Sequence, residues 1–138
     1  MIGELEAEPD PDGVAANLLD SIDLVVPHQA NKTMVIALAG DAGLTPDRLY
    51  FNIAQVGNTS AASIPLAVAD AKADGVIKEP LRVFAPGFGA GAVGGYAVLR
   101  VDPAVVAADS PAGPGTARAW EESATAATSS ENVYEAFR

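Results

Sequence analysis

The stretch from Leu24 to Ser63 constrains the fold of this sequence more than any other. It opens with an apolar run that ends at Pro27 and delivers His28, the only histidine of the chain. It closes with a glycine turn that places Asn58 just before a predicted helix. The thirty positions from His28 to Asn58 allow one crossover helix and one further strand, so both residues should reach the carboxyl edge of one sheet. Two polar groups brought to one edge are what an oxyanion-stabilising pair requires.

The rest of the pattern predicts an α/β fold with a mostly parallel sheet and an antiparallel last strand. The expected strands are 22–26, 49–53, 81–85 and 96–101, and the expected helices are 31–39 and 59–73. Continuous apolar runs favour strands buried on both faces, and the spacing of Met34, Val35 and Leu38 favours an amphipathic helix. A glycine-rich turn over 86–95 joins the last two strands. This β-α-β-α-β-β order is typical of a layered α/β domain.

Length and composition fit one domain that can bury a core, since half of the 138 residues are apolar. No run of 18 uninterrupted apolar residues occurs, which argues against a transmembrane helix. The first residues are acidic rather than basic and then apolar, so they do not form a secretory signal. The sequence has no cysteine, and hence no disulfide and no thiolate metal site. A cytoplasmic protein is expected.

The net charge of −10 resides mainly at the two ends of the sequence. Residues 1–21 hold six acidic residues and no basic one, whereas residues 22–102 are close to neutral. This distribution argues against nucleic-acid binding, which needs a basic face. We expect a solvated acidic lead-in over 1–13, an incomplete folded domain over 14–102 and a low-complexity, disordered tail over 103–138.

Three motifs carry a resemblance to a known family, and they occur in its order and spacing. They are Pro27-His28-Gln29-Ala30-Asn31, Gly57-Asn58-Thr59-Ser60-Ala61-Ala62-Ser63 and Gly87-Phe88-Gly89-Ala90-Gly91. With them, roughly residues 14–102 resemble the C-terminal half of β-ketoacyl-acyl carrier protein synthase III and its relatives in the thiolase superfamily. The resemblance implies a sheet of five strands in the order 3-2-1-4-5, from which the central first strand is absent here.

The resemblance also implies roles for individual residues. His28 and Asn58 would donate hydrogen bonds to a thioester oxygen and stabilise the enolate that forms when a malonyl thioester loses carbon dioxide. The backbone of the loop at Gly89 and Ala90 would contribute to an oxyanion hole, although the family usually has glycine where Ala90 stands, and alanine narrows the available backbone conformations. Lys32 and Arg48 are the basic residues expected to touch an acidic acyl carrier protein.

The substrates implied are acyl thioesters of coenzyme A or acyl carrier protein, in fatty acid or polyketide biosynthesis. The family's nucleophilic cysteine lies in its other half, so this acyltransferase portion should be incomplete alone and should need a cysteine-bearing partner within a dimeric assembly. No cofactor is implied, and one histidine with scattered carboxylates offers no metal-ligand spacing. Two alternatives stay open: transfer of an acyl group to oxygen or nitrogen, and a non-catalytic scaffold subunit.

Each motif also has a simpler interpretation. A single histidine after a strand is often only structural, and Asn58 could act as a helix cap, although Thr59 and Ser60 could cap equally well. Ser60 and Ser63 are poor nucleophile candidates, because the sequence holds no second histidine to serve as their base. Residues 89–94 satisfy G-x-G-x-x-G, but a predicted strand follows them instead of the helix that dinucleotide binding requires.

Overall fold

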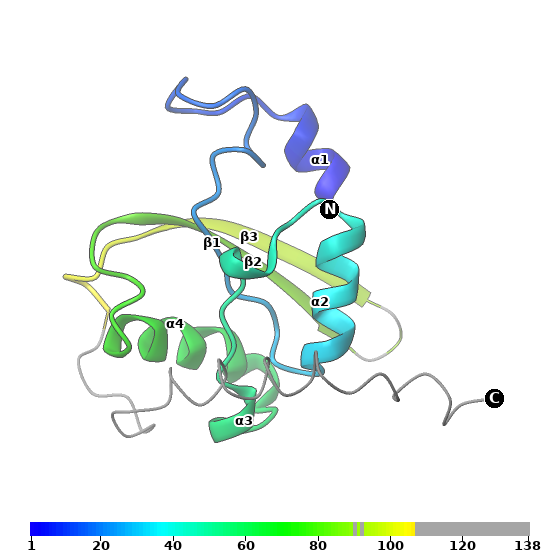
Figure 1. The fold of residues 1–138 in the computed structure, drawn as a ribbon, viewed down its shortest axis with the longest axis vertical. Coiled ribbons are helices and arrows are strands. Elements are labelled where there is room, and N and C mark those ends of the chain that lie inside the picture. The colour runs from blue at the N-terminus through cyan, green and yellow to red at the C-terminus, as the bar shows by residue number, and fades with distance from the viewer. Residues whose placement is uncertain (90, 92, 107–138) are drawn as a thin grey trace.

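The computed structural model describes residues 1–89, 91 and 93–106, and these residues form a sheet with helices on both of its faces (Figure 1). The sheet has three strands in the order β1-β2-β3. The strands are β1 (Leu24–Val25), β2 (Leu81–Gly89) and β3 (Val93–Val101). The helices are α1 (Ile2–Ala7), α2 (Lys32–Asp41), α3 (Ile53–Val56) and α4 (Ser63–Ala73), with 3₁₀ turns η1 (Pro46–Arg48) and η2 (Ser60–Ala62).

β2 and β3 form the antiparallel hairpin that the sequence predicts. Their ladder runs from Leu81 opposite Val101 to Gly89 opposite Val93, so the strands are longer than expected. Most of the predicted glycine turn over 86–95 is therefore strand. β1 lies parallel to β2 on the other side, with Leu24 opposite Val83. The predicted α/β fold with an antiparallel last strand is confirmed.

The sheet has no gap at the position where the resemblance implies a missing central strand. β1 bonds directly to β2, and the ladder continues beyond its two assigned residues on both sides. The Asp23 N–H donates to the Arg82 carbonyl over 2.9 Å, and the His28 N–H donates to the Pro86 carbonyl over 2.8 Å. Since backbone groups inside a sheet need partners, this pairing satisfies the groups that an absent neighbour would otherwise leave unbonded.

Two apolar clusters lie on opposite faces of the sheet, as the alternation of side chains along β1 requires. On one face, Ala67 and Ala71 of α4 pack against a cluster with Leu24, Val26, Tyr50, Ile77, Val83 and Val101. On the other face, α1 and α2 contribute to a cluster of Leu5, Leu19, Ile22, Val25, Ala39, Leu44 and Phe84. Met34 and Leu38 are exposed on α2, so the predicted apolar face of that helix is only partly buried.

The acidic lead-in predicted over residues 1–13 is mostly exposed, but it contains a helix and two buried side chains that the prediction did not include. Ile2–Ala7 forms α1, and Leu5 is only 1% exposed. The Asp10 side chain is also buried, because it accepts hydrogen bonds from the backbone of Asp12, Val14 and Ala15 and pairs with Arg82 of β2 at 2.5 Å. Burial of the apolar sheet face and pairing with Arg82 therefore stabilise this segment against the domain.

The prediction of a strand over 49–53 is wrong beyond its start. Leu49 forms a single parallel bridge with Val25, and α3 begins at Ile53. A side chain replaces the continuing ladder: the buried Gln29 amide donates to the Tyr50 carbonyl and accepts from the Asn52 N–H. The chain therefore leaves the sheet after one bridge while its backbone groups stay satisfied.

Within the described part of the chain, no helix is long and apolar enough to cross a membrane. The prediction of a disordered tail over 103–138 falls, from residue 107 onward, outside the described residues. Before that point, Asp102 closes a turn with Ala104 and Val105, and Val106 packs against the cluster under α4.

Candidate functional site

His28 lies directly beyond the carboxyl end of β1. Its backbone N–H donates to the Pro86 carbonyl, and its carbonyl accepts from the Ala30 N–H over 2.9 Å, so both backbone groups of His28 are bonded. Pro27 before it is buried and ends the apolar run. The histidine is only partly buried, so its ring reaches the surface from a rigid backbone, as a functional side chain requires.

The first residue of α4 holds the imidazole. Ser63 Oγ lies 2.6 Å from His28 Nδ1, and the Gln29 N–H points at the same oxygen over 3.3 Å. Ser63 is 2% exposed, so this contact is shielded from water. The opposite ring nitrogen, Nε2, has no hydrogen-bond partner among the described residues. The strand end and the helix start therefore leave one nitrogen of His28 available.

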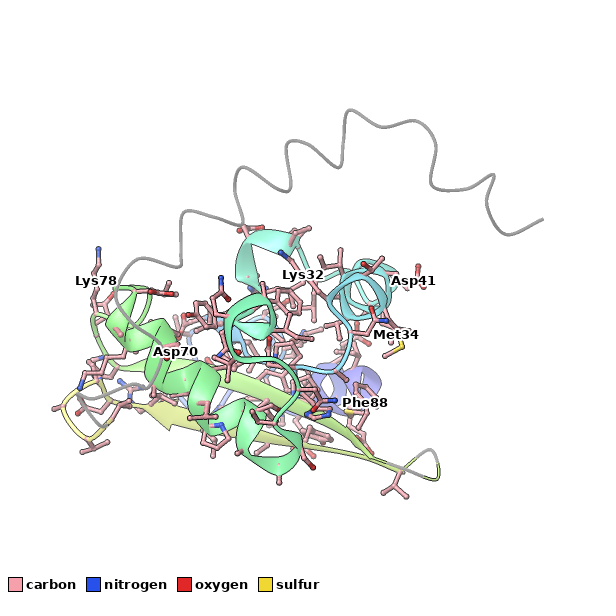
Figure 2. The ribbon with its side chains drawn as sticks, turned by 90° about the horizontal axis from the view of Figure 1, so that it is seen from below. Lys32, Met34, Asp41, Asp70, Lys78 and Phe88 are labelled. Carbon is pink, nitrogen blue, oxygen red and sulfur yellow. The ribbon has the colours of Figure 1, made fainter. Side chains whose placement is uncertain are left out.

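A buried amide network lies behind the histidine. Gln29 is 1% exposed, and its Nε2 donates to the Pro27 carbonyl over 2.8 Å as well as to the Tyr50 carbonyl. Asn52 in turn donates from Nδ2 to Asp70 Oδ2 of α4 over 2.7 Å. These bonds connect the segment around His28 to Asp70 of α4, which Figure 2 labels. A buried polar network whose groups are hydrogen-bonded makes the region rigid.

Asn58 follows a backbone conformation that favours glycine strongly. Gly57 has φ 75° and ψ −169°, a combination that residues with a Cβ adopt only under strain. Asn58 itself is exposed, and its Oδ1 accepts a hydrogen bond from the Ser60 N–H over 2.9 Å. Its Nδ2 group has no partner among the residues that the structure describes. The asparagine thus uses its acceptor locally and keeps its donor available.

A surface hollow of about 540 Å³ lies beside His28, between the start of α4 and the hairpin. The hairpin lines it with small residues, among them Ala85, Gly87 and Gly89, and also with larger apolar ones. Ser60 and Ala61 lie on the helix side. The hollow therefore brings His28 together with Gly89 of the predicted oxyanion loop. Asn58 does not line it, although it lies two residues before Ser60, and Ala90 is outside the described residues.

The two basic residues predicted to contact a carrier protein lie elsewhere. Lys32 begins α2, and its Nζ is 5.7 Å from the centre of the Phe51 ring. Arg48 ends η1 next to Asp47, whose pKa is lowered chiefly by a hydrogen bond from the Thr45 side chain. Both residues are partly buried, and their proposed role in binding stays a prediction. In the described part of the chain, no three potential metal ligands gather.

Sequence reasoning missed the roles of Ser63 and Gln29. Ser63 was weighed only as a nucleophile, and its contact with His28 joins residues 35 positions apart. The helix expected over 59–73 already included Ser63, but the pattern did not mark it as the first residue of that helix. The sequence contained only a weak indication for Gln29. Side chains alternate along an extended segment, so Gln29 should point inward if His28 points outward.

The fold and the site together define a class of protein. An α/β sheet with an antiparallel last strand, a histidine beyond a parallel strand and an asparagine before a covering helix are the features of a thiolase-like C-terminal domain. Residues 15–101 match the family described as 3-Oxoacyl-[acyl-carrier-protein (ACP)] synthase III C terminal. The chain belongs to this family, and the resemblance drawn from its motifs is confirmed.

Curated relatives and solved structures agree with this assignment. The β-ketoacyl-[acyl-carrier-protein] synthase III of Sphingopyxis alaskensis is 50% identical over 82 residues, which cover 59% of this chain and 26% of that protein. The one from Nitratidesulfovibrio vulgaris (strain DSM 19637 / Miyazaki F) is 44% identical over 82 residues, covering 59% of this chain and 25% of that protein.

Among solved structures, 3-oxoacyl-(acyl carrier protein) synthase III from Pseudomonas aeruginosa PAO1 superimposes with a TM-score of 0.55. It is 41% identical, and the match covers 59% of this chain and 25% of that one. The chain therefore spans about a quarter of the length of the relatives that it matches.

Proposed function

We propose that residues 14–102 supply the thioester-activating part of a 3-oxoacyl-acyl carrier protein synthase III-like condensing enzyme. One observation carries the proposal. His28 and Asn58 each have one polar atom occupied by the protein, Nδ1 by Ser63 and Oδ1 by the Ser60 N–H, and each keeps one side-chain nitrogen without a partner among the described residues. Two spare nitrogens on a rigid framework suit the binding of one oxygen that becomes negative.

The reaction would proceed through the thioester of a malonyl group. When its carboxylate leaves as carbon dioxide, the bonding electron pair stays on the α-carbon and charge develops on the thioester oxygen. Hydrogen bonds from His28 Nε2 and Asn58 Nδ2 would stabilise that enolate. The enolate carbon would then attack an acyl thioester, and the thiolate of that thioester would leave. Preorganised donors are worth several kcal/mol at such an oxygen.

The acyl-accepting thiol has to come from outside this sequence, which contains no cysteine. We therefore propose that the domain works together with a cysteine-bearing half and forms part of a dimeric assembly. The hollow beside His28, which the hairpin and the start of α4 line, would hold the thioester. Lys32 and Arg48 stay the proposed contacts to an acidic carrier protein, and Gly89 and Ala90 the proposed oxyanion loop.

A chimera tests this function. Residues 15–101, which match the family, replace the corresponding segment of the Sphingopyxis alaskensis synthase, and the relative supplies its own remaining portion. We expect the chimera to acylate its cysteine from an acyl-coenzyme A and to form a 3-oxoacyl product with malonyl-acyl carrier protein. Asn17→Ala, which changes a partly buried asparagine of the same segment whose side chain bonds only to Asp20 among the described residues, serves as the control.

The two readouts separate catalysis from a scaffold role. A folded chimera that acylates its cysteine but forms no condensed product would contradict the proposal and favour the non-catalytic alternative. A chimera that hands the acyl group to an alcohol or amine without releasing carbon dioxide would favour the other branch of the family. Product formation that Asn17→Ala leaves unchanged and His28→Ala abolishes would support it.

A further inference from the structure

The hydrogen bond between Ser63 and His28 can be made in two ways. Either the serine hydroxyl donates to Nδ1, or Nδ1 carries a hydrogen and donates to the serine oxygen. The two arrangements put the single hydrogen of the neutral imidazole on opposite nitrogens. Only the first leaves a hydrogen on Nε2, the nitrogen that faces away from Ser63.

The surroundings of Ser63 decide between these arrangements. A hydroxyl has one hydrogen to donate and two lone pairs to accept with. The Gln29 N–H already uses one lone pair of Ser63 Oγ. If Nδ1 used the other, the hydroxyl hydrogen would need an acceptor of its own, and Ser63 is 2% exposed with no further side-chain bond in the described structure. A buried hydroxyl hydrogen without a partner is costly.

Donation to Nδ1 is the arrangement that satisfies every group here: the Gln29 N–H, both uses of the hydroxyl, and the lone pair of the ring nitrogen. We propose that the Ser63 hydroxyl donates to His28 Nδ1 and thereby holds the imidazole in the tautomer that carries its hydrogen on Nε2.

Ser63 is then a positioning residue that acts through His28. Its place at the first position of α4, with Gln29 bonded to the same oxygen, fixes both the orientation of the ring and the nitrogen that can donate. The catalytic meaning of this arrangement rests on the proposed function, because a thioester oxygen needs a donor at Nε2 and a lone pair there would repel it. The tautomer itself is a property of the full chain and can be measured without activity.

Nitrogen-15 NMR of the intact 138-residue chain tests the proposal directly, because its single histidine gives one imidazole to observe. Two-bond correlation spectra, recorded well above the ordinary titration range of histidine, identify which ring nitrogen carries the hydrogen. We expect Nε2 to be the protonated nitrogen and Nδ1 to show the shift of a hydrogen-bonded lone pair. In Ser63→Ala, the Nδ1 resonance should move to the position of an unbonded lone pair, and the tautomer preference should weaken.

The control is Ser60→Ala, which removes an exposed hydroxyl three residues earlier in the same turn and leaves the backbone bond to Asn58 in place. Its histidine spectrum should match that of the wild type. A wild-type hydrogen on Nδ1 would overturn the proposal, and this measurement does not depend on a variant that folds. Unchanged resonances in folded Ser63→Ala, or an equal change in Ser60→Ala, would overturn it too. The expected tautomer in a chimera that releases no carbon dioxide would leave this inference standing while the proposed function failed.

Discussion

The conformation of Gly57 predicts that Gly57→Ala lowers the unfolding free energy, whereas the same substitution at a helical glycine should raise it. Gly57 has φ 75° and ψ −169°, and a Cβ added there would meet nothing within 4 Å. The cost of Gly57→Ala is therefore backbone strain and not a clash. Such strain amounts to about 1–3 kcal/mol. Alanine also restricts the unfolded chain, which returns about 0.4–1 kcal/mol. The net loss of unfolding free energy should be about 1–2 kcal/mol.

Gly40 is the matched control because it lies inside α2, and a Cβ there also meets nothing within 4 Å. Its backbone is helical, so Gly40→Ala should raise the unfolding free energy by about 0.5–1 kcal/mol. Urea unfolding followed by circular dichroism would measure both variants at one temperature. A Gly57→Ala variant as stable as the wild type, or shifts of the same sign in both variants, would refute the reasoning. Gly57→Ala should also lower carbon dioxide release in the chimera, since the same strain would displace Asn58.

Three further predictions concern the packing and the charges. Leu5→Ala should lower the unfolding free energy in a urea titration by about 2–4 kcal/mol, because Leu5 is 1% exposed. Glu6→Ala changes an exposed side chain of the same helix and should have little effect; equal losses in the two variants would show that α1 does not pack on the domain. Tyr50→Phe should lower the unfolding free energy by about 1 kcal/mol below pH 10, through loss of the hydrogen bond to Asp74. Burial first, and then the bond to Asp74, raise the pKa of Tyr50, so above pH 10 only the unfolded wild type ionises there and the difference between the two proteins should shrink. A constant difference up to the highest pH studied would contradict this. The Asp10 pKa is lowered, chiefly by the Ala15 N–H, so the wild type should lose stability as the pH falls below about 4, and Asp10→Asn should lose less over that range.

Local sequence patterns predicted the parts of the fold that depend on the chain's own periodicity. The hairpin followed from apolar residues on either side of a glycine-rich segment, and the edge position of His28 followed from a buried run that ends at Pro27. Both features are set by residues that are close in sequence. The family resemblance rested on the same short motifs and was confirmed over residues 15–101.

The features that the sequence did not predict depend on contacts between distant residues. Acidic composition suggested a solvated lead-in, and most of its residues are exposed, but it did not predict that Asp10 pairs with Arg82, 72 positions later. The strand expected from Leu49 onward was interrupted because the Gln29 side chain binds Asn52 in place of a strand neighbour. Neither contact produces a periodic pattern in the sequence, since each depends on one side chain that meets a residue far along the chain.

The candidate site divides in the same way. His28 and Asn58 were predicted as site residues from their motifs, whereas the contact of the Ser63 hydroxyl with the histidine ring became evident only from the position of α4. A serine at the start of a helix has several ordinary roles, including capping, so its residue type alone could not show that it contacts a ring 35 positions earlier.

The central claim is that His28 and Asn58 act as a pair on one developing negative charge. The most direct measurement is the release of labelled carbon dioxide from a malonyl thioester by the chimera and by its His28→Ala and Asn58→Ala variants, with cysteine acylation measured alongside. We expect each single variant to acylate normally and to release carbon dioxide about 10²–10³-fold more slowly, and the double variant to lose less than the product of the two effects. Release at the unsubstituted rate from Asn58→Ala would contradict the paired-donor account.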